Sequence, residues 1–98
     1  MRKQKDTKKI VRADEIKEGG ILYRYTLFVT NSSRVASYGI SLYSMRVEMT
    51  DKNGGHTETE TGDIFADFGK ALVFYERLRD NLATPIDLAY VLEDAITI

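Results

Sequence analysis

The sequence predicts an α+β domain, in which an antiparallel meander of three to four strands is followed by two C-terminal helices packed on one sheet face. Three observations lead to this fold class: period-two alternation over Ile21–Thr30, an Asn-Gly turn at Asn53-Gly54, and helical periodicity that begins after residue 67. A sheet with one apolar face buries that face when the following helices pack across it. At 98 residues, 43% hydrophobic and 30% charged, the chain has room for one such core.

The first two strands are expected on either side of a glycine turn. Ile10–Lys17 is interpreted as a strand, and Gly19-Gly20 supplies the turn before Ile21–Thr30. One face of the second strand is apolar and is expected to meet the helices, whereas the other face is mixed and half exposed. The apolar face consists of Ile21, Tyr23, Tyr25, Leu27 and Val29.

Residues 36–50 are interpreted as one long strand whose apolar face changes along its length. The near end has Tyr38 and Ile40 on one face, and the far end has its apolar residues on the other. We predict a β-bulge between Gly39 and Ser44, because a bulge inserts one residue and glycine often marks it. The far-end apolar residues are Tyr43, Met45, Val47 and Met49.

The Asn-Gly turn leads into an edge strand, residues 56–61, that alternates strictly but has no apolar side chain. His56, Glu58 and Glu60 share one face of this strand and are candidate metal ligands. Residues two apart on a strand are about 7 Å apart, so these three converge on one ion only if a third element supplies a ligand. From the sequence we therefore expect no metal site.

Two helices are expected at the C-terminal end. Apolar residues from Phe68 to Leu82 share one arc, with Asp63 or Asp67 as the N-cap and an end near Asn81. The second helix is marked by Thr84-Pro85-Ile86-Asp87, with threonine as N-cap, proline at the first helical position and a carboxylate at the third.

Several helical residues are candidates for binding a partner. Val73 and Phe74 lie outside the inward arc of the first helix and must meet another helix, a second subunit or water. Tyr90 lies on the acidic side of the second helix, between Asp87 and Asp94, where it is either an isolated surface tyrosine or a contact for a basic partner. The candidate partner-binding residues are Val73, Phe74, Asp87, Tyr90 and Asp94.

Charge is distributed unevenly along the chain. Residues 1–52 carry eleven Lys/Arg against six Asp/Glu, and residues 53–98 carry three against nine. This polarity favours either self-association or an anionic partner, and charge alone does not choose between them. Residues 1–9 lack apolar periodicity, which predicts a flexible basic N-terminal arm before a single domain over residues 10–98. For a nucleic acid, used together with the sheet aromatics, the candidate contacts are Arg2, Lys3, Lys5, Lys8, Lys9 and Arg24.

Other function classes find no support in the sequence. The chain has no cysteine, which excludes disulfides and thiolate metal sites, and no nucleophile-elbow, Walker or Gly-x-Gly-x-x-Gly pattern. We therefore expect neither an enzyme nor a cofactor. The longest apolar run, Ala71–Tyr75, is far shorter than the roughly 20 residues of a membrane span, so we expect a cytoplasmic protein without a membrane partner.

Three stretches together resemble a family of small proteins of unknown function found in clostridia and related spore-forming Firmicutes: Tyr23-x-Tyr25-x-Leu27, Tyr38-Gly39-Ile40 and Thr84-Pro85-x-x-Leu88-x-x-Val91-Leu92-Glu93-Asp94. The resemblance covers roughly residues 21–97 and implies a bacterial cytoplasmic setting, with no catalytic or cofactor residues to carry over. The function we expect is a non-enzymatic protein-interaction or regulatory module, with a homodimer as one form of that interaction. The alternative is a nucleic-acid-binding protein.

Overall fold

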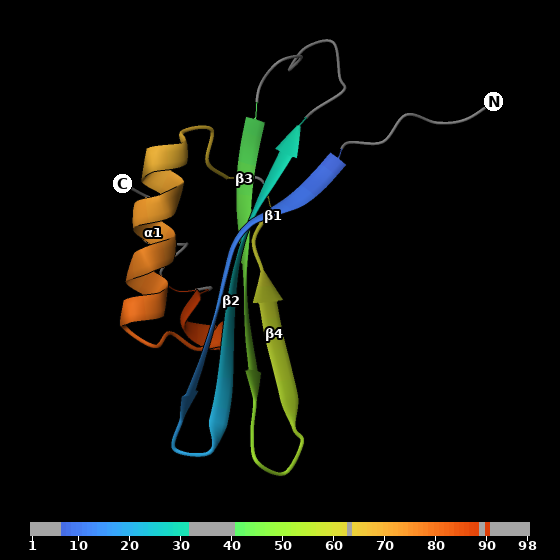
Figure 1. Ribbon diagram of the computed structural model, residues 1–98, viewed down its shortest axis with the longest axis vertical. Helices are drawn as coiled ribbons and strands as arrows, with labels where there is room; N and C mark the ends of the chain where they lie inside the picture. Colours follow the sequence, from blue (N-terminus) through green and yellow to red (C-terminus); the bar gives the residue numbers. More distant parts are fainter. Residues whose placement is uncertain (1–6, 32–40, 63, 89, 91–98) are drawn as a thin grey trace, which may run out of the picture.

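The computed structural model describes residues 7–31, 41–62, 64–88 and 90. One four-stranded antiparallel sheet, in the order β1-β2-β3-β4, is followed by two helices (Figure 1). The elements are β1 (Thr7–Glu18), β2 (Ile21–Asn31), β3 (Ser41–Thr50), β4 (His56–Glu60), α1 (Phe68–Asp80) and a second helix that begins at Pro85. The predicted fold class, a meander with two C-terminal helices, is therefore confirmed.

Both described hairpins turn at glycines with positive φ. Gly19 and Gly20, with φ of 60° and 81°, join β1 to β2. Between β3 and β4, Gly54 has a φ of 90°, and the Asp51 carboxylate accepts hydrogen bonds from the backbone N–H groups of Asn53 and Gly55. These contacts hold the second hairpin in one register, which places β4 residues opposite defined β3 residues.

The helices cover the face of the sheet that the alternation predicts. Tyr25, Leu27, Met45 and Val47 contribute the sheet side of the core, and each is at most 1% exposed. The helices contribute Ala71, Phe74, Tyr75, Leu78 and Leu88. In Figure 1, α1 lies along this one side of the sheet and leaves the other side without a helix among the described residues.

The opposite sheet face is more covered than the sequence predicts. Phe28, expected to be half exposed, is buried because two cations lie over its ring, with Lys8 Nζ 4.4 Å and Arg46 Cζ 5.0 Å from the ring centroid. The long stems of these side chains supply the cover that a helix would otherwise provide.

The start of β1 and the position of the register shift differ from the predictions. β1 begins at Thr7, so residues 7–9 of the predicted arm pair with the end of β2. The register shift lies in β1 between Ile10 and Arg12, whereas the β2–β3 pairing runs without a shift from Ser41 to Thr50. Over its described part the predicted bulge is therefore wrong, and the rest, with Gly39, lies outside the described residues.

Both helix starts follow the predicted capping. The Asp67 carboxylate accepts hydrogen bonds from the N–H groups of Gly69 and Lys70, at 2.7 and 3.3 Å. At the second helix, the N–H of Asp87 donates to the Thr84 hydroxyl and the N–H of Thr84 donates to the Asp87 carboxylate, at 3.2 and 3.0 Å. The alternative N-cap, Asp63, lies outside the described residues.

Candidate partner-binding site on the outer face of α1

A set of polar contacts to β1 and β2 fixes the rotation of α1 on the sheet. The Tyr75 hydroxyl donates to the Asp14 carboxylate at 2.6 Å and also lies 3.1 Å from the carbonyl oxygen of Tyr25. Arg79 lies 3.5 Å from the same Asp14 carboxylate. This arrangement lowers the pKa of Asp14, chiefly through the Tyr75 hydrogen bond and then through the charges of Arg12 and Arg79, and burial raises the pKa of Tyr75. Because Tyr75 faces inward, Val73 must face outward.

The structure separates the two helical residues that the sequence grouped. Val73 is 56% exposed, whereas Phe74 is 9% exposed and belongs to the core. The ring of Phe74 packs against that of Phe65, with centroids 5.3 Å apart and planes at 49°. Phe65 precedes α1 and bridges to Tyr43 of β3, so it covers a flank of α1 that the helical arc leaves open.

The surface beside these residues is hollowed in two places. The first hollow, of about 560 Å³, has an apolar wall formed by Phe65, Val73 and Phe74. The second, of about 310 Å³, lies between α1 and the second helix and reaches Asp87 and Tyr90. Phe74 and Arg77 line both hollows, so the two are neighbouring parts of one surface. We call this surface the α1 groove and define it by Phe65, Lys70, Val73, Phe74, Arg77 and Tyr90.

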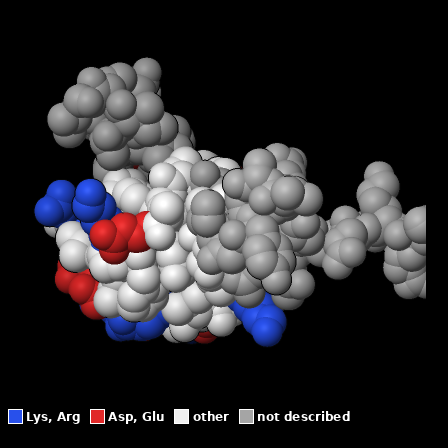
Figure 2. Space-filling view, turned by 90° about the horizontal axis from the view of Figure 1, so that it is seen from above, with Lys and Arg blue, Asp and Glu red and all other residues white. Residues whose placement is uncertain are grey.

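Charged groups border the apolar part of the α1 groove. Lys70 and Arg77, one turn to either side of Val73 and Phe74, form no ion pair within the described part of the chain. The carboxylates of Asp67 and Asp87 cap helices, where they offset the positive end of each helix dipole. Figure 2 shows cationic, anionic and uncharged surface together on the side of the molecule where α1 lies. Among the described residues, the charged groups of the groove that neither cap a helix nor form an ion pair are therefore the cations Lys70 and Arg77.

The predicted partner-binding residues are brought together only in part. Val73, Phe74, Asp87 and Tyr90 line adjoining hollows, and Tyr90 is 65% exposed as predicted. Asp94 lies outside the described residues. Asp87 is engaged as a helix cap, and Arg77 lines the same hollow as Tyr90, so the described surroundings of Tyr90 are less acidic than predicted.

Sequence reasoning missed three groove residues, Phe65, Lys70 and Arg77. Lys70 and Arg77 follow the helical spacing i, i+3, i+4, i+7 with Val73 and Phe74, so a search for mixed basic and apolar stripes would have found them. Phe65 lies in a segment with neither helical nor strand periodicity, and no local signal indicates its contact with Phe74.

The predicted nucleic-acid contacts are mostly neutralised where they are described. Lys8 pairs with Glu60, and Arg24 pairs with Glu15 at 2.7 Å. Lys9 is exposed on β1, whereas Arg2, Lys3 and Lys5 lie outside the described residues. The aromatic residues needed for base stacking are covered too, with Tyr23 and Tyr25 beneath the helices and Phe28 beneath its two cations.

Comparison with other proteins identifies the family of this chain but does not indicate its function. Among the described residues, no helix combines the length and the apolar character needed to cross a membrane. No curated protein and no solved structure matches the chain. A family model covers residues 2–98, nearly the whole sequence. The chain therefore belongs to the family of unknown function DUF6514.

Proposed function

We propose that this protein is a non-enzymatic interaction module that binds an acidic amphipathic segment of a partner protein in the α1 groove. The observation that carries this proposal is the apolar wall of Phe65, Val73 and Phe74, flanked by Lys70 and Arg77, for which the described part of the chain provides no ion-pair partner. We place this function in the cytoplasm of spore-forming Firmicutes, which is the setting that the sequence resemblance implies.

The geometry supports a partner helix with one or two apolar anchors. An apolar side chain that enters a hollow of about 560 Å³ would lie against Val73 and the ring of Phe74. Its burial contributes roughly 25 cal/mol for each Å² of apolar surface removed from water. Carboxylates one turn to either side of the anchor would meet Lys70 and Arg77, which fixes the orientation of the partner and speeds association.

The test uses two labelled amphipathic peptides that share leucine anchors and differ only in their flanking charges, glutamate in one and lysine in the other. Fluorescence anisotropy with the full chain should show tighter binding of the glutamate peptide. Val73→Glu should weaken this binding at least tenfold, because a carboxylate would then face the anchor. The double variant Lys70→Glu, Arg77→Glu should reverse the preference between the two peptides.

Lys17→Glu is the matched control, because Lys17 is an exposed β1 cation with no ion pair among the described residues. It makes a charge change of the same kind away from the groove and should leave both affinities unchanged. Equal binding of both peptides, or no binding by a protein that sediments as a strict monomer, would rule the proposal out. If the chain sediments as a dimer that Val73→Glu dissociates, the occupant of the groove is a second copy, and the acidic-partner proposal fails.

A further inference from the structure

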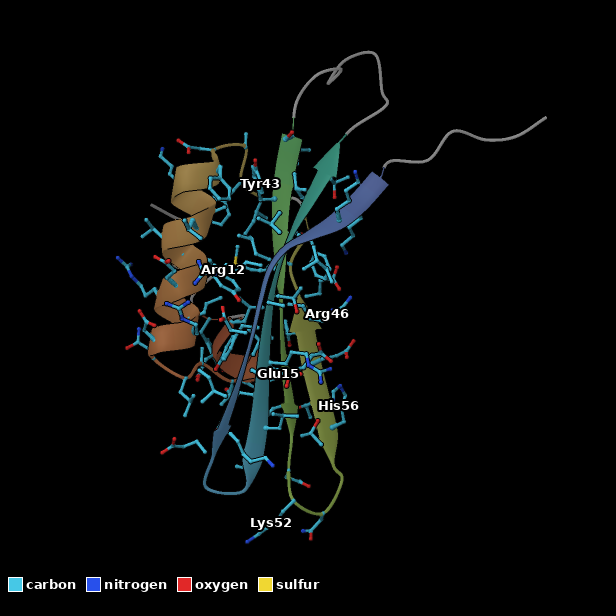
Figure 3. All side chains as sticks on the ribbon, viewed as in Figure 1. Arg12, Glu15, Tyr43, Arg46, Lys52 and His56 are labelled. Atoms are coloured by element: carbon cyan, nitrogen blue, oxygen red, sulfur yellow. The ribbon has the colours of Figure 1, made fainter. Side chains whose placement is uncertain are left out.

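The β3–β4 hairpin brings together side chains on the sheet face away from α1 that the proposed function does not use. The antiparallel register places Glu48 opposite Glu58 and Thr50 opposite His56. Residues directly opposite one another project from the same face, so two carboxylates and the only histidine of the chain share one surface. Figure 3 shows His56 of β4 and Arg46 of β3 away from α1, and Arg12 and Tyr43 on the α1 side.

The neighbouring strand β3 supplies a further candidate ligand, Glu48, beside His56 and Glu58 of the edge strand. His56 Nε2 lies 3.0 Å from Glu58 Oε1 and 3.7 Å from Glu48 Oε1. The candidate ligand atoms of all three residues lie within 4.8 Å of one another. Ligands bound at about 2.1 Å from a first-row metal ion are roughly 3.0–3.5 Å apart, so small side-chain rotations would complete the coordination. Glu60, the ligand considered from sequence, pairs instead with Lys8 and Arg46.

The hydroxyl of Thr50 holds the other ring nitrogen of His56, Nδ1. Thr50 Oγ1 lies 2.9 Å from His56 Nδ1, which leaves Nε2 directed at the two carboxylates. If Nε2 coordinates an ion, Nδ1 carries the proton and donates it to the hydroxyl oxygen of Thr50. A hydrogen bond of this kind fixes the ring orientation of metal-binding histidines and strengthens the ligand.

The charges of the cluster fit a divalent ion. Glu48 and Glu58 form a like-charge cross-strand pair, an arrangement that destabilises a sheet unless a cation lies between the carboxylates. Arg24 and Arg46 approach Glu48 only to 3.9 and 3.8 Å, and their shorter ion pairs are with Glu15 and Glu60, at 2.7 and 3.0 Å. Two carboxylates and a neutral imidazole supply the two negative charges that such an ion requires.

We propose that Glu48, His56 and Glu58 bind a divalent first-row transition metal ion such as Zn²⁺. Imidazole nitrogen favours such an ion over Mg²⁺ and Ca²⁺, which prefer oxygen ligands. Three protein ligands leave a position for water or for a group from another molecule. The ion would join β3 to β4 on the face opposite the α1 groove. The metal site is therefore tested independently of the proposed function.

The test uses the full chain without an affinity tag, and the probe is Zn²⁺ itself. Isothermal titration should give one site with a dissociation constant of about 10 μM or lower, which corresponds to about −7 kcal/mol or a more favourable value. His56→Ala should weaken binding at least 30-fold, and Glu58→Gln at least fivefold. Mg²⁺ and Ca²⁺ at the same concentrations should not compete.

Glu60→Gln is the matched control, since Glu60 lies on the same strand and face but pairs with Lys8 and Arg46. Its affinity for Zn²⁺ should stay within threefold of that of the parent chain. Because the chain has one histidine, nitrogen-15 NMR of its ring gives a direct readout in which Zn²⁺ should shift Nε2 much more than Nδ1. Binding that survives in His56→Ala, a dissociation constant above about 100 μM, or an unshifted Nε2 signal would overturn the proposal.

Discussion

At the scale of single residues, two buried tyrosine hydroxyls connect the sheet to the helices. Tyr25 donates to the carbonyl oxygen of Ala83 at 2.8 Å, and Tyr75 donates to Asp14 at 2.6 Å. Each bond joins a strand to a segment at least fifty residues away in sequence. These hydroxyls therefore set how the helical layer sits on the sheet, and they make stability depend on pH at both ends of the scale.

Tyr25 makes the fold sensitive to alkali. Burial, and then the nearby Tyr23 and Asp87, raise the pKa of Tyr25 to about 12. Because the pKa of Tyr25 is higher in the folded state, its protonated form stabilises the fold at pH values below about 10, the ordinary pKa of tyrosine. This stabilisation is lost as the pH rises from there through the pKa of the folded state.

Tyr25→Phe should lower the free energy of unfolding at pH 7 by about 1 kcal/mol, because the carbonyl oxygen of Ala83 loses its donor. It should also flatten the loss of stability between about pH 10 and 12. Urea denaturation across this range checks both effects. Identical slopes for the two proteins would contradict the assignment of this alkaline loss to Tyr25.

Asp14 makes the stability of the fold depend on pH in the acidic range. The Tyr75 hydrogen bond, together with the Arg12 and Arg79 charges, lowers the pKa of Asp14 below its ordinary value of 3.8. Because the pKa of Asp14 is lower in the folded state, its ionised form stabilises the fold at pH values above the pKa of the unfolded state. This stabilisation is lost as the pH falls through the pKa of the folded state.

Asp14→Asn should therefore reduce the melting temperature near neutral pH and weaken its decline below about pH 4. Glu18→Gln is the control, since Glu18 is an exposed carboxylate at the end of the same strand. It should leave the acid profile close to that of the parent chain. Thermal melts between pH 2 and 6 decide the matter, and equal acid profiles for parent chain and Asp14→Asn would refute the assignment.

At the scale of elements, the start of the second helix contributes directly to the core. Leu88 is fully buried, four residues after its N-cap Thr84, and belongs to the same cluster as Tyr25 and Met45. The reciprocal Thr84–Asp87 caps fix the direction in which the helix leaves the chain.

Leu88→Ala should lower the free energy of unfolding by about 2–5 kcal/mol, the range for a fully buried leucine. Val73→Ala, on the exposed side of α1, should change it by less than about 0.5 kcal/mol. Chemical denaturation of both variants measures the contrast. Comparable losses at the two positions would mean that α1 is rotated relative to the arrangement described.

Local sequence signals predict the elements well, because alternation, Asn-Gly turns and capping boxes act over a few residues. Asp67, Thr84 and Gly54 each take the role that their local pattern predicts. The register shift in β1 between Ile10 and Arg12 was not predicted, because no local signal in this strand marks where its pairing with β2 changes register. Glu48 was missed as a partner of His56 for the same reason, since that proximity depends on the β3–β4 register.

At the scale of the whole molecule, the two faces of the sheet are stabilised in different ways. One face is covered by helices and the other by cross-strand ion pairs, including Lys8–Glu60 and Arg24–Glu15. Because Lys8 and Arg24 are paired, two of the cations that the nucleic-acid alternative requires are already neutralised on the described sheet. For this reason we propose the α1 groove, and not the sheet, as the surface that contacts a macromolecular partner.

This division of the surface predicts how the protein responds to nucleic acid. Sedimentation with a mixed pool of short single-stranded oligonucleotides at low and moderate salt should show no salt-sensitive shift. A shift that falls steeply with salt, and that is lost when Lys3, Lys5 and Lys9 are replaced by glutamine, would contradict this prediction and establish the basic N-terminal segment as a nucleic-acid contact.

The most direct test of the central claim is to map, by NMR, where the glutamate-flanked peptide binds on the isotopically labelled full chain. The account predicts chemical-shift changes centred on Phe65, Lys70, Val73, Phe74 and Arg77, with the β3–β4 hairpin unaffected. Changes centred on β1 and β2, or no changes at peptide concentrations that saturate the anisotropy signal, would contradict the assignment of the α1 groove as the partner-binding site.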